Sequence, residues 1–364
     1  MGRVIRLTQF EPYQKIKPSD FPESIPFYEK GKPPRHDLWL KQSFLDEEEK
    51  MFGKKWGESG IGKLREVLLC RPVDPGQSIF KKDPVYYMYP GGKLPDVPRL
   101  QEQHDALAKI YKDEGIDVNY MEYPPIGPYG PIKWMIFTPR EPLYVRGGAI
   151  IQRTASHPYA RGREIYLMRA LTELGCPILY TVHGTGAFEI GASFFIAENV
   201  FFTGRSIAYN EDGLEQVTPV LRRAGIKEIV VNHIPGPLDS IDWPMGGTYH
   251  PDMFCGVIDI GLVIVYPPWC AYETIEWLRE HKFKMIEIPA EEQRKYLTAN
   301  TVILEPGKVV IAKGAKQTIA ALTKEGVECI EHDYTEFWNE GGGIRCATGM
   351  LARDPGPSLE EIMR

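Results

Sequence analysis

The chain has 364 residues, of which 43% are hydrophobic and 25% are charged, so it can bury a large core in one or two domains. Its 43 Lys and Arg residues against 49 Asp and Glu residues give a formal charge of −6, too mild to indicate binding to nucleic acid or to an acidic membrane. No run of 18 apolar residues occurs and the first residues lack a signal peptide's apolar stretch, so we expect a cytoplasmic protein without a membrane span.

Residues 1–60 differ from the rest of the chain. They are rich in charge and in proline, including Pro12, Pro18, Pro22 and Pro26. Such a composition alone is typical of disorder, and we expect it to form an arm that wraps over the domain or over a partner subunit. A homo-oligomer is therefore plausible. The expected organisation is an arm over residues 1–60 and one catalytic domain over residues 61–364.

A loose repeat begins near residue 60, in which an amphipathic helix, a Gly or polar break and a short strand follow one another. The expected helices span residues 99–114, 161–174, 213–224, 272–281 and 317–325. Strands follow them at residues 116–120, 177–182, 228–232, 284–288 and 327–330. Strand-like segments, often hairpins, precede them at residues 64–70, 142–153, 193–203, 256–266 and 301–313. Five ββαβ-like units predict a closed α/β propeller with five-fold pseudo-symmetry.

Neither a dinucleotide fold nor a disulfide framework fits the sequence. Gly184-Thr185-Gly186 lacks the third glycine of a dinucleotide-binding loop, and no cofactor is expected. The six cysteines show no CxxC and no regular spacing, and several lie in apolar runs. Reduced thiols fit this pattern better than disulfides.

The segment Gly341–Thr348, with the sequence GGGIRCAT, is the most informative of the chain. Three glycines allow the backbone to approach a ligand closely and to present Cys346 on what we expect to be an exposed loop. A nearby cation such as Arg345 and partial exposure favour the thiolate, which is the attacking form of cysteine. The loop alone is also compatible with a turn that merely contains a cysteine.

Other candidates occupy equivalent places in the repeat. Glu141 precedes the second hairpin, Glu189 the third, and His250 and Asp252 the fourth, whereas Cys346 follows the last unit. In a closed ring, equivalent positions of successive units converge on the central axis. We therefore expect these five side chains to share one cavity, and we interpret the set as covalent catalysis by cysteine.

These motifs resemble those of the guanidino-group-modifying enzymes, a superfamily that includes arginine deiminases, dimethylarginine dimethylaminohydrolases and amidinotransferases. The resemblance covers roughly residues 60–355 and implies the five-fold pseudo-symmetric α/β propeller, or pentein fold. It rests on Gly341–Thr348 as the nucleophile motif, His250-Pro251-Asp252, Phe188-Glu189 and the segment FTPREP from Phe137 to Pro142.

The resemblance implies a role for each candidate. Glu141 and Asp252 would clamp the guanidinium through paired hydrogen bonds, and the Cys346 thiolate would add to its central carbon. His250 would protonate the departing amine and then activate the second nucleophile, while Glu189 would orient His250. The intermediate would be an amidino-thioether on Cys346. The substrate would be a small guanidino compound.

Three departures from the family pattern affect these expectations. The usual Asp is here Glu141, and Ala192 and Ala208 stand where hydrolases carry a second carboxylate and arginine deiminases a carboxylate-binding Arg. Free arginine held in the usual way is therefore in doubt. Other arginines could bind a substrate carboxylate, namely Arg161, Arg163, Arg205 and Arg345; among them we select Arg205 and Arg345 as candidate substrate-binding residues.

Three functions stay open at this point. The favoured one is a cofactor-free hydrolase of a guanidino compound, with an amidinotransferase as the alternative. Metal-assisted hydrolysis through His250, Asp252 and Cys255 is a second class, although the spacing matches no standard metal site. A propeller that only binds a ligand is the third. Asn300 opens the last hairpin and receives no role.

Overall fold

The computed structural model describes residues 29–33, 40–57, 60–73, 95–122, 126–127, 130–131, 134–155, 160–234 and 250–364. The chain divides into two units, Met1–Glu47 and Glu48–Arg364. Most of the predicted arm, including its prolines between residues 12 and 26, lies outside the described residues, so the wrapping of the arm stays a prediction. Of the first unit, the described part includes the start of helix α2 (Phe44–Phe52).

The second unit is built from repeated ββαβ modules, as the sequence predicts. In each module an antiparallel strand pair is followed by a helix and by a strand that runs parallel to the second strand of the pair. The second module contains β5 (Leu143–Val145), β6 (Gly148–Ile151), α5 (Arg163–Leu174) and β7 (Ile178–Thr181). The third contains β8 (Phe194–Ala197), β9 (Val200–Arg205), α6 (Glu211–Arg223) and β10 (Glu228–His233).

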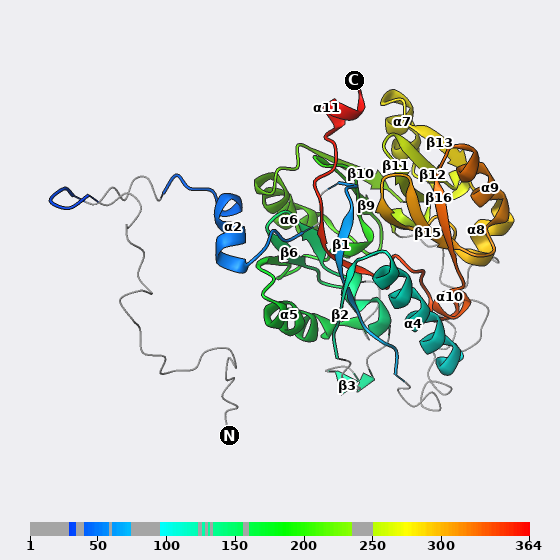
Figure 1. Ribbon diagram of the computed structural model, residues 1–364, viewed down its shortest axis with the longest axis horizontal. Coiled ribbons are helices and arrows are strands. Elements are labelled where there is room, and N and C mark those ends of the chain that lie inside the picture. Colours follow the sequence, from blue (N-terminus) through cyan, green and yellow to red (C-terminus); the bar gives the residue numbers. More distant parts are fainter. Residues whose placement is uncertain are drawn as a thin grey trace. The chain divides into compact units, whose positions relative to one another are not determined.

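The next two modules repeat this order. The fourth contains β11 (Cys255–Asp259), β12 (Leu262–Val265), α7 (Tyr272–Glu280) and β13 (Lys284–Glu287). The fifth contains β14 (Val302–Glu305), β15 (Lys308–Ala312), α9 (Lys316–Lys324) and β16 (Glu328–His332). Figure 1 shows the helices of these modules at the periphery of the second unit, with the small sheets inside them.

The first module is completed by the C-terminal end of the chain, which the sequence analysis missed. It contains β1 (Leu64–Leu69), α4 (Val97–Asp113) and β2 (Asp117–Tyr120), and β1 pairs in parallel with β2. The antiparallel partner of β1 is β17 (Gly349–Arg353). This pairing closes the ring of five three-stranded sheets, and the protein has the five-fold pseudo-symmetric α/β propeller fold.

Shorter elements connect the modules and form the edge of the site. The short 3₁₀ helices are η4 (Met135–Arg140), η6 (Ile190–Ala192), η7 (Pro251–Met253) and η8 (Pro267–Trp269). The remaining helices and strands are α8 (Ala290–Tyr296), α10 (Thr335–Glu340), α11 (Leu359–Ile362), β3 (Ile126–Gly127) and β4 (Gly130–Pro131).

Local chemistry explains where the helices begin and end. The side chain of Asp96 accepts a hydrogen bond from the backbone of Arg99 at the start of α4, and Asn210 does the same for α6. Because Asn210 is the cap, α6 begins two residues earlier than predicted. Glycine ends α5, where Gly175 adopts the left-handed conformation that closes a helix.

The core lies between the inner strands of the modules and their helices. The first strand pair of each described module is almost wholly buried; β12, for example, has four buried residues in succession. A run of this kind is typical of a strand covered on both faces. In the described part of the chain, no helix has the length and apolar character needed to cross a membrane.

Candidate active site

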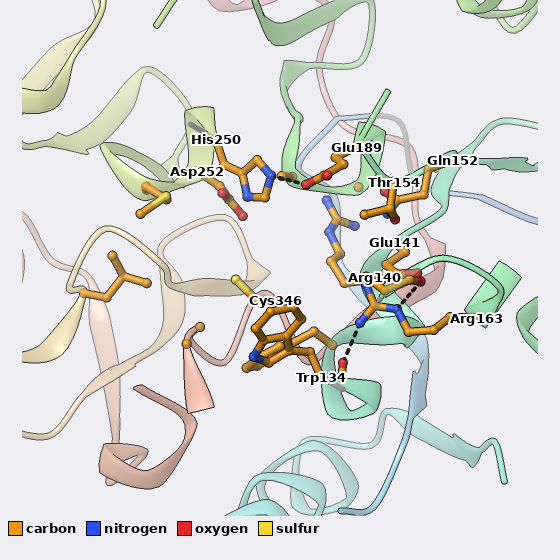
Figure 2. A pocket seen from close by; sticks show the side chains of 18 residues that line it. Trp134, Arg140, Glu141, Gln152, Thr154, Arg163, Glu189, His250, Asp252 and Cys346 are labelled. Carbon is orange, nitrogen blue, oxygen red and sulfur yellow. Dashed lines mark hydrogen bonds and ion pairs between the residues drawn. The ribbon is translucent and has the colours of Figure 1, made fainter. Parts of the chain in front are cut away.

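A pocket of about 120 Å³ lies where the modules meet. Its polar lining consists of Arg140, Glu141, Gln152, Thr154, Arg163, Glu189, His250, Asp252 and Cys346. Its apolar lining includes Trp134, Phe137, Ala160, Met253 and Leu297. Figure 2 shows Cys346, His250 and Glu189 around the same cavity, with Glu141 and Arg163 at another part of its wall.

Five of the polar residues lie on segments that precede a strand of a module. Glu141 follows η4 and leads into β5, Glu189 leads through η6 into β8, and His250 and Asp252 lead through η7 into β11. Cys346 precedes β17, the strand that completes the first module. The five candidates that the repeat places at equivalent positions therefore line one pocket.

The fifth module contributes Asn300, two residues before β14, which the sequence analysis named as the residue that opens the last hairpin but to which it gave no role. Its side-chain oxygen accepts hydrogen bonds from the backbone N–H groups of Arg345 (3.0 Å) and Cys346 (3.3 Å). Its amide nitrogen donates to Cys346 Sγ at 3.2 Å and to Asp252 Oδ2 at 3.3 Å. Asn300 occupies the same place in its module as the other candidates do in theirs. The repeat in the sequence could therefore have identified it.

The glycines before Cys346 are required by close packing. Gly341 has φ +115° and ends α10, and a Cβ on Gly343 would lie 2.4 Å from Asn300 Oδ1. A Cβ on Gly342 would lie 2.8 Å from the Phe137 ring. The loop is therefore packed against the pocket wall. The expectation of an exposed loop is wrong, since Arg345 is buried and Cys346 is half-buried.

The protonation state of Cys346 also differs from the expectation. Burial and the negative charge of Asp252 raise the pKa of its thiol to about 12, and the opposing effects of Arg345 and Asn300 are smaller. The nearby hydroxyl of Thr348 is buried and shares a hydrogen bond of 2.7 Å with the Tyr111 hydroxyl rather than with the thiol. The thiol is neutral before a substrate binds.

His250 is oriented by Glu189. The Nε2 atom of His250 lies 2.8 Å from Glu189 Oε2, and the other oxygen of Glu189 accepts a hydrogen bond from the backbone of Ala155 at 3.1 Å. The imidazole packs edge-on against the Tyr209 ring, with 6.2 Å between centroids. A buried carboxylate on one ring nitrogen fixes the ring orientation and stabilises the protonated imidazole.

Asp252 is held from behind by Arg345. Arg345 Nη1 donates to Asp252 Oδ2 at 2.6 Å, and its Nη2 donates to the carbonyl of Ser193 at 2.6 Å. Arg345 does not line the pocket; it contacts the wall residue Asp252. A position behind Asp252 fits a structural cation better than the predicted substrate contact.

Glu141 forms an ion pair with Arg163, and both side chains are buried. Arg163 also donates to the backbone carbonyls of Ala160 and Trp134, each at 3.0 Å. Burial raises the pKa of Glu141 to about 8, because the loss of hydration outweighs the attraction of Arg163. Arg163 was only one of several possible anion-binding arginines in the sequence, and its pairing with Glu141 was not foreseen.

Arg205 lies outside the pocket lining. It ends β9 with a partly exposed side chain and forms an ion pair with Glu211. This position gives no support to the predicted contact with substrate. The two alanines that depart from the family pattern lie in different places. Ala192 lines the pocket, whereas Ala208 is fully buried in the core.

The residues named for a metal site do not gather as ligands. Within the described ranges, no three His, Cys, Asp or Glu side chains lie close enough together to hold a metal ion. Cys255 is buried among apolar side chains, and burial raises the pKa of its thiol well above the usual value.

Two sequence comparisons agree with this geometry. A family model for arginine deiminase matches residues 269–353. A 2-nitroimidazole nitrohydrolase from Mycobacterium sp. (strain JS330) is 31% identical over 328 residues, which cover 86% of each chain. The chain belongs to the guanidino-group-modifying enzyme superfamily. It is therefore an enzyme.

Solved structures of the superfamily share the fold. A dimethylarginine dimethylaminohydrolase, determined as an adduct with 4-chloro-2-hydroxymethylpyridine, aligns with a TM-score of 0.61 at 19% identity. The alignment covers 79% of this chain and all of that one. SxtG, an amidinotransferase from Microseira wollei, aligns with a TM-score of 0.62 at 15% identity and covers 82% of this chain and 97% of its own.

Proposed function

We propose that the chain is a cysteine-dependent hydrolase that replaces a leaving group on a carbon bonded to two nitrogens, through a thioether on Cys346. The observation that supports this most directly is the single pocket that contains the Cys346 thiol and the His250–Glu189 pair. A nucleophile, a proton carrier and a group that orients the carrier are the parts that covalent catalysis needs.

The first step forms the carbon–sulfur bond. Because the thiol is neutral in the empty site, it must lose its proton as the substrate binds, and His250 is the acceptor that lines the same pocket. The sulfur then attacks the carbon, and the leaving group departs with the electron pair of its bond. An amine leaving group takes the proton from His250. Glu189 stabilises the imidazolium formed in between.

The second step releases the product. Water adds to the same carbon while His250 removes its proton, and the carbon–sulfur bond then breaks. Cys346 recovers a proton and the product carries the oxygen of water. An amine that takes the place of water would receive the group instead, which is the amidinotransferase alternative.

The proteins to which the chain is similar supply two substrate classes. The names of the similar hydrolases give arginine and dimethylarginine, whereas the name of the Mycobacterium protein gives 2-nitroimidazole. In each compound, the carbon that would be attacked is bonded to two nitrogens that stay and to one group that leaves. The leaving group is an amine in the guanidino compounds and nitrite in 2-nitroimidazole. We propose that this shared carbon is the electrophile for Cys346.

A substrate panel tests the proposal. The panel contains arginine, methylated arginines, agmatine and 2-nitroimidazole, each with and without an amine acceptor, and products are identified by mass spectrometry. If a product that carries oxygen from water forms in the absence of an amine acceptor, the result supports the hydrolase. Transfer of the amidino group to the amine supports the amidinotransferase alternative.

Replacement of the nucleophile gives the sharpest control. Cys346→Ala should reduce turnover by at least about 10³-fold while the protein stays folded. Cys329→Ala removes another half-buried thiol, on β16 and outside the pocket lining, and should leave turnover unchanged. Full activity of Cys346→Ala would contradict the mechanism.

Three further expectations stay predictions. They are the cytoplasmic location, the absence of a cofactor and the formation of a homo-oligomer. Sedimentation of the purified chain tests the oligomer, and activity after exhaustive dialysis against a chelator tests the cofactor.

A further inference from the structure

Each carboxylate of the pocket already has a partner from the protein. Glu141 pairs with Arg163, Asp252 with Arg345, and Glu189 with His250. All three carboxylate side chains are at most 8% exposed. A site that binds a guanidinium needs carboxylates that are free to face the substrate. In this site, two of them face guanidinium groups of the chain itself.

The formal charges of the site cancel. The three carboxylates are matched in number by three buried arginines, namely Arg140 and Arg163 in the pocket lining and Arg345 behind Asp252. The pocket and its immediate support therefore carry no excess of negative charge, and the raised pKa of Glu141 lowers its share of negative charge further. A cationic substrate would enter a buried site without a matching negative charge, which is strongly unfavourable.

Displacement of Arg163 from Glu141 would not solve this problem. Arg163 also donates to the backbone carbonyls of Ala160 and Trp134, and the arginine is 5% exposed. A substrate cation on Glu141 would separate this buried guanidinium from the carboxylate, and breaking a buried ion pair is costly.

The site nevertheless offers acceptors for N–H groups. The two oxygens of Glu141, although ion-paired with Arg163, accept no hydrogen bond from the described residues, and the same holds for one oxygen of Asp252. Asp252 is 1% exposed and lines the pocket, and its Oδ1 atom has no hydrogen-bond partner among the described residues. Figure 2 shows the Asp252 carboxylate beside His250, at the edge of the cavity that Cys346 also borders. A single N–H donor on an uncharged ring satisfies this oxygen without adding charge.

The remaining walls suit a flat apolar ligand. Trp134 and Phe137 lie on one part of the lining, and Met253 and Leu297 come from other modules. Aromatic and aliphatic side chains bind the faces of a planar ring well, whereas a flexible charged chain would gain little from them.

We propose that the substrate is an uncharged planar heteroaromatic ring, with one ring N–H and a leaving group on the carbon between two nitrogens, rather than a guanidinium cation. The inference rests on the proposed function. For a nitro-substituted imidazole, the carbon–sulfur bond to Cys346 forms as the bond to the nitro group breaks, and nitrite departs with the electron pair. Water then replaces sulfur and gives the ring ketone, so the overall reaction consumes one water and releases one proton.

Two ligands of similar shape but different charge show whether the charge of the ligand or its shape determines binding. Imidazol-2-one is uncharged, whereas 2-aminoimidazole is a cyclic guanidine that is protonated at neutral pH. Their affinities are measured by calorimetry with full-length Cys346→Ala, which cannot turn them over. Imidazol-2-one should bind at least about tenfold more tightly, equivalent to about 1.4 kcal/mol. Equal or tighter binding of the cation overturns the inference, and so does a failure of both to bind.

A variant that removes the charge of Arg163 tests whether the Glu141–Arg163 ion pair is what disfavours a cationic ligand. Arg163→Gln in the Cys346→Ala background frees Glu141 and should shift the affinity ratio toward 2-aminoimidazole by about tenfold or more. Arg161→Gln is the matched control, because Arg161 donates to the carbonyl of Thr154 without lining the pocket. An unchanged ratio in Arg163→Gln contradicts the role given to the ion pair.

Turnover distinguishes this inference from the function on which it rests. Consumption of 2-nitroimidazole but not of agmatine or arginine by the wild-type enzyme supports both. Cysteine-dependent hydrolysis of the guanidino compounds alone overturns the uncharged substrate and retains the hydrolase. Cysteine-independent turnover, or none with either class, overturns both.

Discussion

Asn300 holds the nucleophile at three atoms of the Gly341–Thr348 loop. Its side-chain oxygen bonds the backbone of Arg345 and Cys346, and its amide nitrogen reaches Cys346 Sγ and Asp252. The residue is fully buried. It is a positioning residue, because it fixes the sulfur relative to the carboxylate and to the rest of the pocket.

Asn300→Ala should reduce kcat by about 10- to 100-fold with a smaller change in KM, because the sulfur loses its fixed position and a donor that favours the thiolate. Steady-state kinetics and the pH dependence of thiol alkylation provide two readouts, and the alkylation curve should move to higher pH. Asn232→Ala is the control: Asn232 is equally buried but bonds Thr203 and Thr274. A similar loss of kcat in both variants would indicate a structural effect only.

The raised pKa of Cys346 predicts its reactivity in the empty enzyme. Alkylation by iodoacetamide should rise with pH through the range of about 9 to 11 without reaching a plateau, because the thiol has a pKa of about 12. Asp252→Asn removes a charge that raises this pKa, so the curve should move to lower pH. A plateau below pH 8 in the wild-type protein would contradict the neutral resting thiol.

Sequence reasoning located Glu141, Glu189, His250, Asp252 and Cys346 because each has a recognisable chemical type at an equivalent place in the repeat. Their catalytic roles stay predictions. The sequence did not reveal how Glu141 and Asp252 are neutralised, because their partners are arginines of other segments that only the fold brings near. The pKa of Cys346 was misjudged for the same reason: the adjacent Arg345 is visible in the sequence, whereas burial and Asp252 are not.

At the scale of elements, α10 connects the fifth module to the catalytic loop. The Phe337 ring of α10 packs against both His104 and His332, with 6.3 Å between ring centroids in each case. The carbonyl of Phe337 accepts the backbone N–H groups of Gly341 and Gly342, which begin the loop. The packing of two buried histidines therefore supports the position of Cys346.

Acid should destabilise this packing. Burial lowers the pKa of both His104 and His332 to about 4 from the usual 6.5, so the folded state takes up protons less readily than the unfolded chain. The stability present above pH 6.5 is lost as pH falls toward 4, with up to about 1.4 kcal/mol per pH unit for each histidine.

Urea unfolding between pH 7 and 4.5 measures this effect, with the slope of the free energy of unfolding against pH as the readout. His104→Phe should reduce the slope because one titrating group is removed. His183→Gln, on the surface, is the control and should leave it unchanged. An identical slope in wild type and His104→Phe would contradict the assignment.

The helices and strands of the modules were predictable from local sequence. The 3.6-residue period, the glycine breaks and the runs of β-branched residues specify each ββαβ unit within about 60 residues. Helices α8 and α10 were missed because they are short and lack a clear period. The pairing of β17 with β1 was missed because nothing local specifies a contact between the two ends of a ring.

For the whole molecule, closure of the ring depends on Arg353. This buried side chain ends β17 and donates to the carbonyl of Gly62 before β1 (2.6 Å) and to that of Ile303 in β14 (2.8 Å). It thus ties the first module to the fifth through backbone acceptors that water cannot reach.

Arg353→Met should lower the free energy of unfolding by about 2 to 4 kcal/mol, because buried carbonyls lose charged donors. Denaturant unfolding at constant pH measures the change. Arg65→Met is the matched control, since Arg65 pairs with Asp354 on the surface of the same strands and should contribute less than about 1 kcal/mol. Equal losses would contradict a specific role in closure.

The central claim is that one ring of modules positions a cysteine for covalent attack. Its most direct test is intact-protein mass spectrometry of enzyme quenched with acid during turnover of 2-nitroimidazole and, separately, of the guanidino compounds. The account predicts a mass increase equal to the substrate without its leaving group, mapped to the peptide that contains Cys346 and absent from Cys346→Ala. Turnover without any adduct, by wild type and Cys346→Ala alike, would contradict it.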